Sequence, residues 1–351
     1  MKPSVRRTEK RAGNHRPGIP GHGRVTIIAA AAVLLAALVG GYLLLRPRPV
    51  FLVEDAFVPA WEKLLREDPD APGWRIVTYD PREGLTSTRG LRGYRISMDR
   101  EGRPQAGRSV AAGSAESVPV PVVVRDLSRN QMSPDGALPL ALDPWLVFRR
   151  HSAPPPSRDP LEKGVSGAVL LLPGGEPEAL RAWAAQELQN RPGAFPSDSG
   201  SWLDTMGRLA RDGRFQPGAL TARWEDVLSR LTSPGVSWLY APLSRVQTLP
   251  GDRTSLLEAD PFPPREGWNE FGLQARILWA LPLGGGTPRG SAAAAARWLG
   301  DPAVQTRLGS ILDWAPAHRD ARAANPLARA AQEAWLESTY VWEAPEHAHI
   351  D

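Results

Sequence analysis

The amino-acid sequence predicts an α/β protein in which strands and helices alternate, preceded by one membrane-spanning helix. Pro49–Glu54 is a short apolar run typical of a buried strand. An amphipathic helix is expected over Phe57–Arg66, and a second strand over Trp74–Tyr79. Strand, helix and strand at this spacing predict a right-handed βαβ unit of a parallel sheet. The chain has 351 residues, enough for one large domain or two modest ones.

The N-terminal segment predicts how the chain meets the membrane. Val25–Leu45 is twenty-one residues without a charge, and about 20 apolar residues span a bilayer core. The preceding residues 1–24 carry seven Lys or Arg and one Glu, so they should remain in the cytoplasm. Signal-peptide cores are usually shorter, about 7–15 residues, and no small-x-small cleavage site follows. An uncleaved signal anchor is therefore favoured over a cleaved signal peptide, and it places the rest of the chain outside the cytoplasmic membrane.

Charge and cysteine content exclude several classes of function. Residues 1–24 contribute +6 to the net +4 charge, so the remainder sums to −2. The outer part therefore has no basic stripe for nucleic acid. The chain has no cysteine, which excludes disulfides, thiolate metal sites, a cysteine nucleophile and a lipid anchor on cysteine.

The stretch Leu138–Arg150 lies near the middle of the outer part. Its apolar runs Leu138–Leu142 and Trp145–Phe148 each have the length of a strand. Because proline has no N–H to donate to a sheet, Asp143–Pro144 predicts a stiff kink between two short extended pieces. An edge strand with a bend is the alternative interpretation.

The remaining elements follow from periodicity and capping residues. Further strands are expected at Tyr94–Met98, Val118–Arg125, Val165–Leu172, Gly235–Ala241 and Ile277–Leu283. Further helices are expected at Glu176–Leu188, Ser201–Arg211, Leu220–Leu231 and Ala292–Leu299, the last capped by Ser291. Two more should begin at the cap-proline pairs Asp301–Pro302 and Asn325–Pro326. Arg82–Ser117 and Asp252–Trp268 are expected to be irregular.

Two segments in the expected order resemble the extracellular solute-binding proteins of ABC importers. The crossover between lobes in that family is similar to Ala137, Leu138, Pro139, Asp143, Leu146 and Phe148–Arg150. A late helix and turn of the family are similar to Ala294, Trp298, Leu299, Asp301, Pro302, Gln305, Leu308, Pro316 and His318. The resemblance departs from the family at Arg82–Ser117, where the first lobe looks trimmed.

The resemblance implies an α/β protein of two lobes with the type II periplasmic-binding-protein-like fold, which here follows the predicted membrane anchor. Together with the basic cytoplasmic tail over 1–24 and the anchor over 25–45, it predicts a first lobe from 49–142 plus about 250–290, a second lobe from 143–249 plus about 291–340, and a tail over 341–351. It also implies a small-molecule solute, of carbohydrate type in this branch, and an ABC permease as partner.

Ligands of two-lobed α/β proteins bind at the carboxyl ends of strands. Carboxylates there can accept hydrogen bonds from sugar hydroxyls, and aromatic faces can stack on sugar C–H surfaces. These criteria select Asp55, Asp143, Trp145, Trp238, Tyr240, Trp268 and Trp314. Ordinary core packing is the alternative for each aromatic residue, and a helix cap or turn for each aspartate.

Catalytic signatures are absent from the sequence. It contains no His-Glu-x-x-His, no Gly-x-Ser-x-Gly and no Walker lysine. We therefore expect a binding protein without catalytic residues, metal or cofactor. A second hypothesis is a sensor or scaffold that binds a membrane protein and transports no solute. A weaker third is an extracytoplasmic hydrolase that uses Asp55 and Asp143.

Overall fold

The computed structural model describes ten stretches of the chain. They are residues 49–81, 91–98, 122–123, 136–156, 168–189, 207, 209–263, 272–283, 290–338 and 340–343. They belong to one compact unit, Arg48–Asp351. The predicted anchor Val25–Leu45, most of the predicted helix Ser201–Arg211, and Trp268 lie outside the described residues.

The N-terminal βαβ unit is present as predicted. Strand β1 (Val50–Glu54) leads through a short 3-10 turn into helix α2 (Val58–Glu67), and β2 (Arg75–Tyr79) follows. β1 pairs in parallel with β2 and with β3 (Gly93–Ser97). Gly93 is required in this packing, because a Cβ there would lie 2.0 Å from the Val50 carbonyl oxygen and its φ is +127°.

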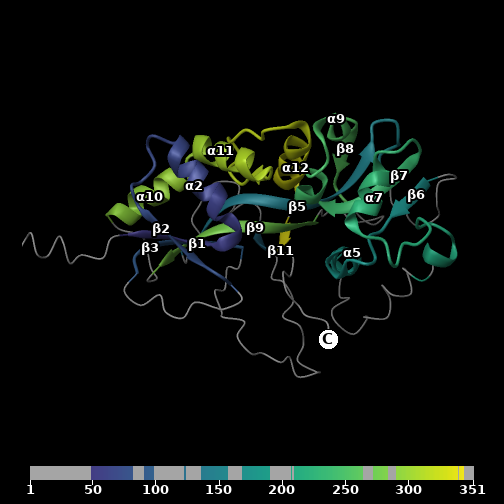
Figure 1. Cartoon of the computed structure of the whole chain (residues 1–351), viewed down its shortest axis with the longest axis horizontal. Helices are drawn as coiled ribbons and strands as arrows, with labels where there is room; N and C mark the ends of the chain where they lie inside the picture. The colour runs from purple at the N-terminus through teal and green to yellow at the C-terminus, as the bar shows by residue number, and fades with distance from the viewer. Residues whose placement is uncertain are drawn as a thin grey trace, which may run out of the picture. The chain divides into compact units, whose positions relative to one another are not determined.

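Two long antiparallel strands form the middle of the sheet. Strand β5 (Leu138–Arg150) pairs with β9 (Gly272–Leu283), and β9 pairs on its other edge with β3. Figure 1 shows β5 and β9 running side by side between β1–β3 and β6–β7. The full order is β2-β1-β3-β9-β5-β7-β6.

The predicted break within Leu138–Arg150 is wrong, because β5 is one continuous strand. Its neighbours change at the predicted position. Residues up to Pro144 pair with β9, and residues from Trp145 onward pair with β7 (Val236–Pro242). The proline can remain in the strand because it lies where one pairing ends and the next begins.

A second group of strands surrounds the C-terminal half of β5. Strand β6 (Ala168–Leu171) pairs in parallel with β7, and β8 (Leu257–Asp260) pairs antiparallel with β5. The helices of this region are α5 (Pro177–Gln189), α7 (Trp224–Leu231), α8 (Leu243–Val246) and α9 (Gly251–Thr254).

The structure corrects three sequence-based expectations here and downstream. The segment Asp252–Trp268, expected to be irregular, contains part of α9 and all of β8. Helix α7 begins at Trp224, four residues later than predicted. Ser291 is the first residue of α10 (Ser291–Leu299) and makes no cap hydrogen bond; Gly290 is the N-cap.

The last helices begin as their caps predict. Helix α11 (Pro302–Leu312) is capped by Asp301, whose carboxylate accepts the Ala303 N–H at 2.7 Å. Helix α12 (Pro326–Glu337) is capped by Asn325, whose amide oxygen accepts the Ala328 N–H at 2.8 Å. Such caps each contribute about 0.5–2 kcal/mol. The short strands are β4 (Val122–Val123), β10 (Ala315–Pro316) and β11 (Tyr340–Glu343).

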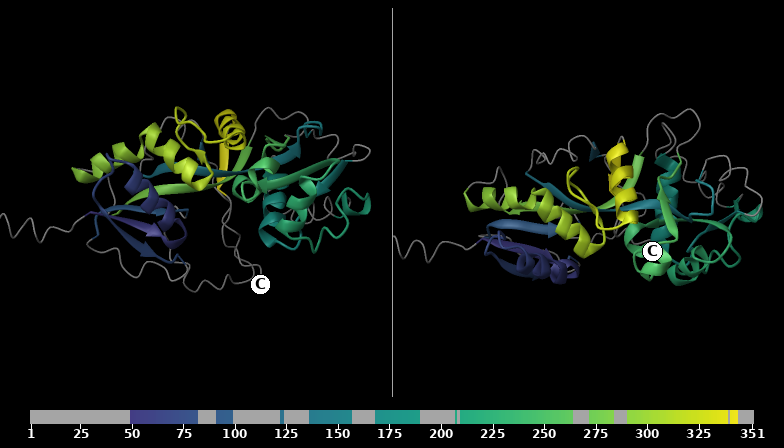
Figure 2. Two further views of the ribbon diagram at one scale, coloured as in Figure 1. Left: turned by 45° about the horizontal axis from the view of Figure 1, so that its top comes forward. Right: turned by 90° about the horizontal axis from the view of Figure 1, so that it is seen from above.

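The apolar side chains form two cores that share β5 and β9. The first core holds β1, β3, α2, α10 and α11, with Trp61 and Trp298 among its large members. The second core holds β6, β7, α5, α7 and α12, with Trp183 and Trp335. Figure 2 shows α10 and α11 beside the N-terminal strands.

The predicted lobe boundaries stay a prediction, but the packing bears on them. The sequence-based division placed about 291–340 in the second lobe, whereas α10 and α11 pack in the first core and α12 in the second. It also placed 341–351 in a tail, whereas residues 341–343 belong to β11, which pairs with β9. The packing therefore favours a first lobe that includes α10 and α11.

Candidate functional site

Asp143 lies at the point where β5 changes partners. Its side chain is fully buried. One carboxylate oxygen accepts the Ser244 backbone N–H at 2.8 Å, and the other accepts the Ser244 hydroxyl at 2.8 Å and the Arg276 Nε–H at 3.0 Å. Arg276 Nη2 also donates to this second oxygen and to the Ser244 hydroxyl at 2.9 Å.

These contacts join strands and a helix that are distant in sequence. Asp143 and Arg276 face each other across the β5–β9 ladder, and Ser244 lies in the first turn of α8, directly after β7. The charge of the buried carboxylate is balanced by one guanidinium and satisfied by several donors, as a buried ion requires. The structure therefore places Asp143 inside the protein, as a partner of Arg276 and α8.

Trp314 extends this group toward the end of β1. The Arg276 guanidinium carbon lies 5.9 Å from the centre of the Trp314 ring. The same ring meets Phe57 edge-on, with centroids 5.8 Å apart. Phe57 follows the carboxyl end of β1, so Trp314 links that strand end to Arg276. We call Asp143, Ser244, Arg276 and Trp314 the junction cluster.

Trp145 and Tyr240 also come together, within the second core. Their ring centroids are 5.4 Å apart. The Tyr240 hydroxyl lies 3.0 Å from the Gln186 side-chain oxygen and 3.2 Å from that of Gln274. Burial raises the pKa of Tyr240 well above 10. Trp145 and Tyr240 are each 4% exposed, so their faces are covered by protein.

The other predicted site residues lie apart from this group. Trp238 is buried and its Nε1–H donates to the Pro154 carbonyl at 3.1 Å, near the other end of β5. Asp55 is exposed and accepts the N–H of its neighbour Ala56 at 2.8 Å. Trp268 lies outside the described residues.

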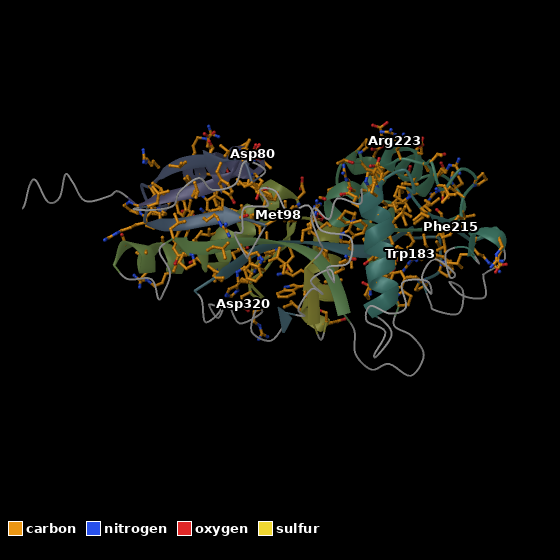
Figure 3. The ribbon with its side chains drawn as sticks, turned by 90° about the horizontal axis from the view of Figure 1, so that it is seen from below. Asp80, Met98, Trp183, Phe215, Arg223 and Asp320 are labelled. Atoms are coloured by element: carbon orange, nitrogen blue, oxygen red, sulfur yellow. The ribbon has the colours of Figure 1, made fainter. Side chains whose placement is uncertain are left out.

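The selected site residues leave out a polar edge of the first sheet, although its strand ends are predictable from the sequence. Glu54 ends β1 and is 6% exposed. Its carboxylate accepts the Ser97 hydroxyl at 3.3 Å and the Met98 N–H at 3.5 Å, both at the end of β3. Asp80 follows β2, and Figure 3 shows Asp80 and Met98 near the same edge. The signal was available, because all three parallel strands end there.

A second missed group lies at the start of three helices. Glu178 in the first turn of α5 accepts both the Trp224 Nε1–H and an Arg245 Nη2–H, each at 2.9 Å. The Arg245 guanidinium carbon lies 5.5 Å from the centre of the Trp224 ring. We call Glu178, Trp224 and Arg245 the helix-start group.

The helix-start group borders the junction cluster, and its two charged side chains remain accessible. Arg245 is next to Ser244, and the Trp224 ring lies 6.2 Å from that of Trp145. The side chains of Arg245 and Glu178 are 44% and 42% exposed. Within the described residues, Arg245 Nε and Nη1 and one Glu178 oxygen have no protein partner. They can donate to and accept from a polar ligand.

The described residues contain no group of three His, Asp or Glu side chains arranged to hold a metal ion. Asp143, one of the two carboxylates considered for hydrolysis, is enclosed, and Asp55 does not join it. Hydrogen bonding through Arg245 and Glu178 is the chemistry that the accessible side chains of these two groups offer, because the rings of Trp224 and Trp314 are buried.

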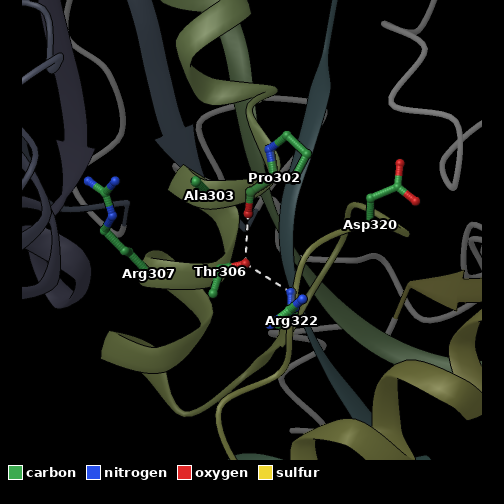
Figure 4. Close-up of a pocket in the computed structure, with 6 residues that line it drawn as sticks. All are labelled: Pro302, Ala303, Thr306, Arg307, Asp320 and Arg322. Atoms are coloured by element: carbon green, nitrogen blue, oxygen red, sulfur yellow. Dashed lines mark hydrogen bonds between the residues drawn. The ribbon is translucent and has the colours of Figure 1, made fainter.

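A separate surface pocket of about 390 Å³ lies at the start of α11 (Figure 4). Its lining is Pro302, Ala303, Thr306, Arg307, Asp320 and Arg322. The Thr306 hydroxyl donates to the Pro302 carbonyl at 2.7 Å and accepts the Arg322 N–H at 2.8 Å. Arg307 pairs with the buried Asp68 at 2.6 Å. The Thr306 hydroxyl and the Arg307 guanidinium are thus engaged within the protein, and no lining residue belongs to the predicted site.

Within the part of the chain that the structure describes, no helix has the length and apolarity to cross a membrane. The prediction for Val25–Leu45 concerns residues outside that part.

Comparisons with known proteins identify the fold. No family model matches the sequence, and no curated protein matches it. Solved structures do match. The bacterial solute receptor AcbH, described as having an exclusive preference for β-D-galactopyranose, aligns with a TM-score of 0.57 at 14% identity over 84% of this chain and 87% of its own.

Two further structures give similar values. The putative binding protein MsmE of Bacillus subtilis, in an open conformation, has a TM-score of 0.57 at 12% identity, covering 85% of this chain and 87% of its own. A probable secreted solute-binding lipoprotein of Streptomyces coelicolor has a TM-score of 0.55 at 15% identity, covering 85% and 88%. The resemblance noted in the sequence is thus confirmed at the level of fold: this chain has the α/β fold of the two-lobed solute-binding proteins of ABC importers.

Proposed function

We propose that this chain is an extracytoplasmic solute-binding protein anchored in the cytoplasmic membrane by Val25–Leu45. It captures a small carbohydrate between its lobes by closure and delivers it to an ABC permease. The observation that carries the proposal is the fold, which aligns with a sugar receptor over 84% of this chain and 87% of that receptor. The neighbours are binding proteins, so we propose no enzymatic activity.

The arrangement around β5 and β9 supports a site between the cores. These strands contribute to both cores, and a junction of few strands allows hinge closure. The accessible Arg245 and Glu178 are the side chains that we propose to contact the solute directly. The buried residues Asp143, Trp145, Tyr240 and Trp314 would then support the site from behind. Asp55, Trp238 and Trp268 remain more distant candidates.

The carbohydrate class is the finer part of the proposal and needs a broad test. A chitin oligosaccharide binding protein shares the fold at a TM-score of 0.51 and 14% identity. A Bordetella ferric binding protein shares it at 0.52 and 14%. Because one fold carries both ligand classes, the class must come from measurement.

The test is thermal unfolding of the full-length chain in detergent with galactose, chitin oligosaccharides, amino acids, peptides and ferric citrate. A ligand at about 100 times its dissociation constant adds about 2.7 kcal/mol, which raises the midpoint by a few degrees. We expect a shift with one sugar class only. Arg245→Met should weaken that sugar at least about tenfold, since a hydrogen bond involving a charged group contributes about 1.5–3 kcal/mol.

Arg253→Met is the matched control, because Arg253 is an exposed residue of α9 outside both groups. It should leave sugar affinity unchanged. A shift with amino acids or iron alone would contradict the carbohydrate class and retain solute binding.

One observation favours the second candidate, a sensor or scaffold that binds a membrane protein. Trp145, Tyr240 and Trp314 are only 4–6% exposed, so none offers a free ring face for stacking on a sugar. Under this alternative no solute shifts the midpoint of the folded chain, and crosslinking in native membranes yields one specific partner at the surface around Arg245.

A further inference from the structure

The turn after β5 holds a histidine between two hydrogen-bond acceptors. His151 Nδ1 lies 2.7 Å from a Glu258 carboxylate oxygen, and Nε2 lies 3.0 Å from the Ser255 carbonyl oxygen. Glu258 belongs to β8, and Ser255 follows α9. Both ring nitrogens are therefore engaged by the segment that pairs with β5.

The two acceptors impose a protonation state on the ring. A neutral imidazole carries one N–H, so it can donate to only one of these oxygens. Its other nitrogen would then present a lone pair to an oxygen lone pair. The imidazolium carries two N–H groups and satisfies both contacts. The positions of the two acceptors thus favour the protonated ring, independently of the charges nearby.

The charges around His151 act in opposite directions. The hydrogen bond to Glu258, followed by that to Ser255, raises the pKa of His151 above its ordinary 6.5, while Arg149 on β5 opposes the rise. The hydrogen bond from His151 correspondingly lowers the pKa of Glu258. Asp260 on β8 binds Arg149 at 2.7 Å and offsets its charge. We call Arg149, His151, Glu258 and Asp260 the end cluster.

The contacts of His151 close the end of a ladder. The β5–β8 register ends at Arg150 and Leu257. The His151 N–H continues it by donating to the Leu256 carbonyl at 3.1 Å, and Arg149 Nη1 donates to the Ala153 carbonyl at 2.7 Å. Without the ring contacts, the backbone hydrogen bond from His151 to Leu256 would be the remaining link between these two residues' segments at the end of the ladder.

We propose that His151 is a proton-dependent latch, which fastens residues 255–258 to the end of β5 when the ring is protonated and loosens them when it is not. The latch needs no solute, so it stands apart from the proposed transport function. It makes the α9–β8 segment responsive to pH near neutrality, where histidine titrates.

The sign of the effect follows from the raised pKa. The folded state binds the His151 proton more tightly than the unfolded state, so the stabilisation is complete below about pH 6.5 and is lost as pH rises through the raised pKa. Glu258 must also be ionised, which holds above its ordinary pKa of 4.5. The latch is therefore closed in mildly acidic solution.

The test is an NMR titration of the full-length chain labelled with ¹⁵N-histidine, with His151→Gln used to assign the signal. We expect His151 to titrate above its ordinary pKa, and Glu258→Gln to lower that pKa. Titration at or below the ordinary value, unchanged by Glu258→Gln, would overturn the proposal.

A second measurement separates a latch from a histidine that titrates without consequence. The unfolding midpoint of the wild type should exceed that of His151→Gln at about pH 5.5, and the difference should shrink as the pH rises through the raised pKa of His151. His318→Gln is the control, because His318 lies outside the end cluster and its Nδ1 accepts the Asp320 N–H at 3.0 Å. A difference for His151→Gln that does not change with pH would refute the latch.

Discussion

Strand β5 carries two ionic groups of opposite design, the junction cluster near its middle and the end cluster at its end. In the junction cluster the buried partner is a carboxylate, with Asp143 fully enclosed and Arg276 23% exposed. In the end cluster the buried partner is a guanidinium. Arg149 is 8% exposed, whereas Glu258 and Asp260 are 40% and 27% exposed.

The two clusters differ in whether the carboxylates can be hydrated once their arginine partner is removed. Asp143 cannot reach water, so without Arg276 it would be an uncompensated buried charge. Glu258 and Asp260 can hydrate without Arg149. The junction cluster should therefore tolerate less change than the end cluster, although both pair Arg with Asp.

The largest effect is expected for Arg276→Met. It leaves the Asp143 carboxylate buried without its counter-charge, which costs about 3–5 kcal/mol. Urea unfolding of the full-length chain should measure this loss. Arg319→Met is the control, since Arg319 is 61% exposed and such changes stay within about 0.5 kcal/mol. Adding Asp143→Asn to Arg276→Met should recover part of the loss; no recovery would argue against the buried charge as its cause.

A smaller loss is expected for Arg149→Met. The side chain gives up hydrogen bonds to Glu258, Asp260 and the Ala153 carbonyl, but both carboxylates can hydrate. We expect about 1.5–3 kcal/mol in the same urea experiment. A loss equal to that of Arg276→Met would remove the proposed contrast between the two clusters.

Ser244→Ala tests one contact of the junction cluster. It removes the hydroxyl that donates to Asp143 and accepts from Arg276, while the backbone N–H remains in place. We expect a loss of about 1 kcal/mol. Ser244→Thr keeps the hydroxyl and should lose less; if both variants lose equally, packing rather than hydrogen bonding explains the effect.

The smallest effect belongs to His151→Gln. The side chain is 55% exposed, so the ion pair with Glu258 should contribute no more than about 1 kcal/mol, as exposed pairs do. Added salt should reduce this contribution and leave that of Arg276 nearly unchanged, because exposed charges are screened and buried ones are not. Equal salt sensitivity would contradict the difference in burial.

Local signals predicted much of the fold. The caps Asp301 and Asn325 act through hydrogen bonds within three residues, so sequence alone identifies them. The βαβ unit follows from periodicity in the same way. β8 was missed because Leu257–Asp260 has only four residues, half of them acidic, and becomes a strand by pairing with β5.

The site was less accessible to sequence reasoning. Asp143 and Trp314 were selected from strand ends and aromatic type, but Arg276, which joins them, lies opposite Asp143 only through the β5–β9 register. The helix-start group likewise brings together Glu178, Trp224 and Arg245 from three helices. Neither set has a fixed spacing in sequence, since tertiary packing creates both.

The sharing of β5 and β9 by two cores has a consequence for cooperativity. The first core takes Leu138 and Leu278 from these strands, and the second takes Leu146 and Ile277. Unfolding of either half would remove packing contacts from β5 and β9, and the other half also depends on these strands. The two halves should therefore lose their structure in a single calorimetric transition, whose van't Hoff enthalpy equals the measured enthalpy, as in one domain.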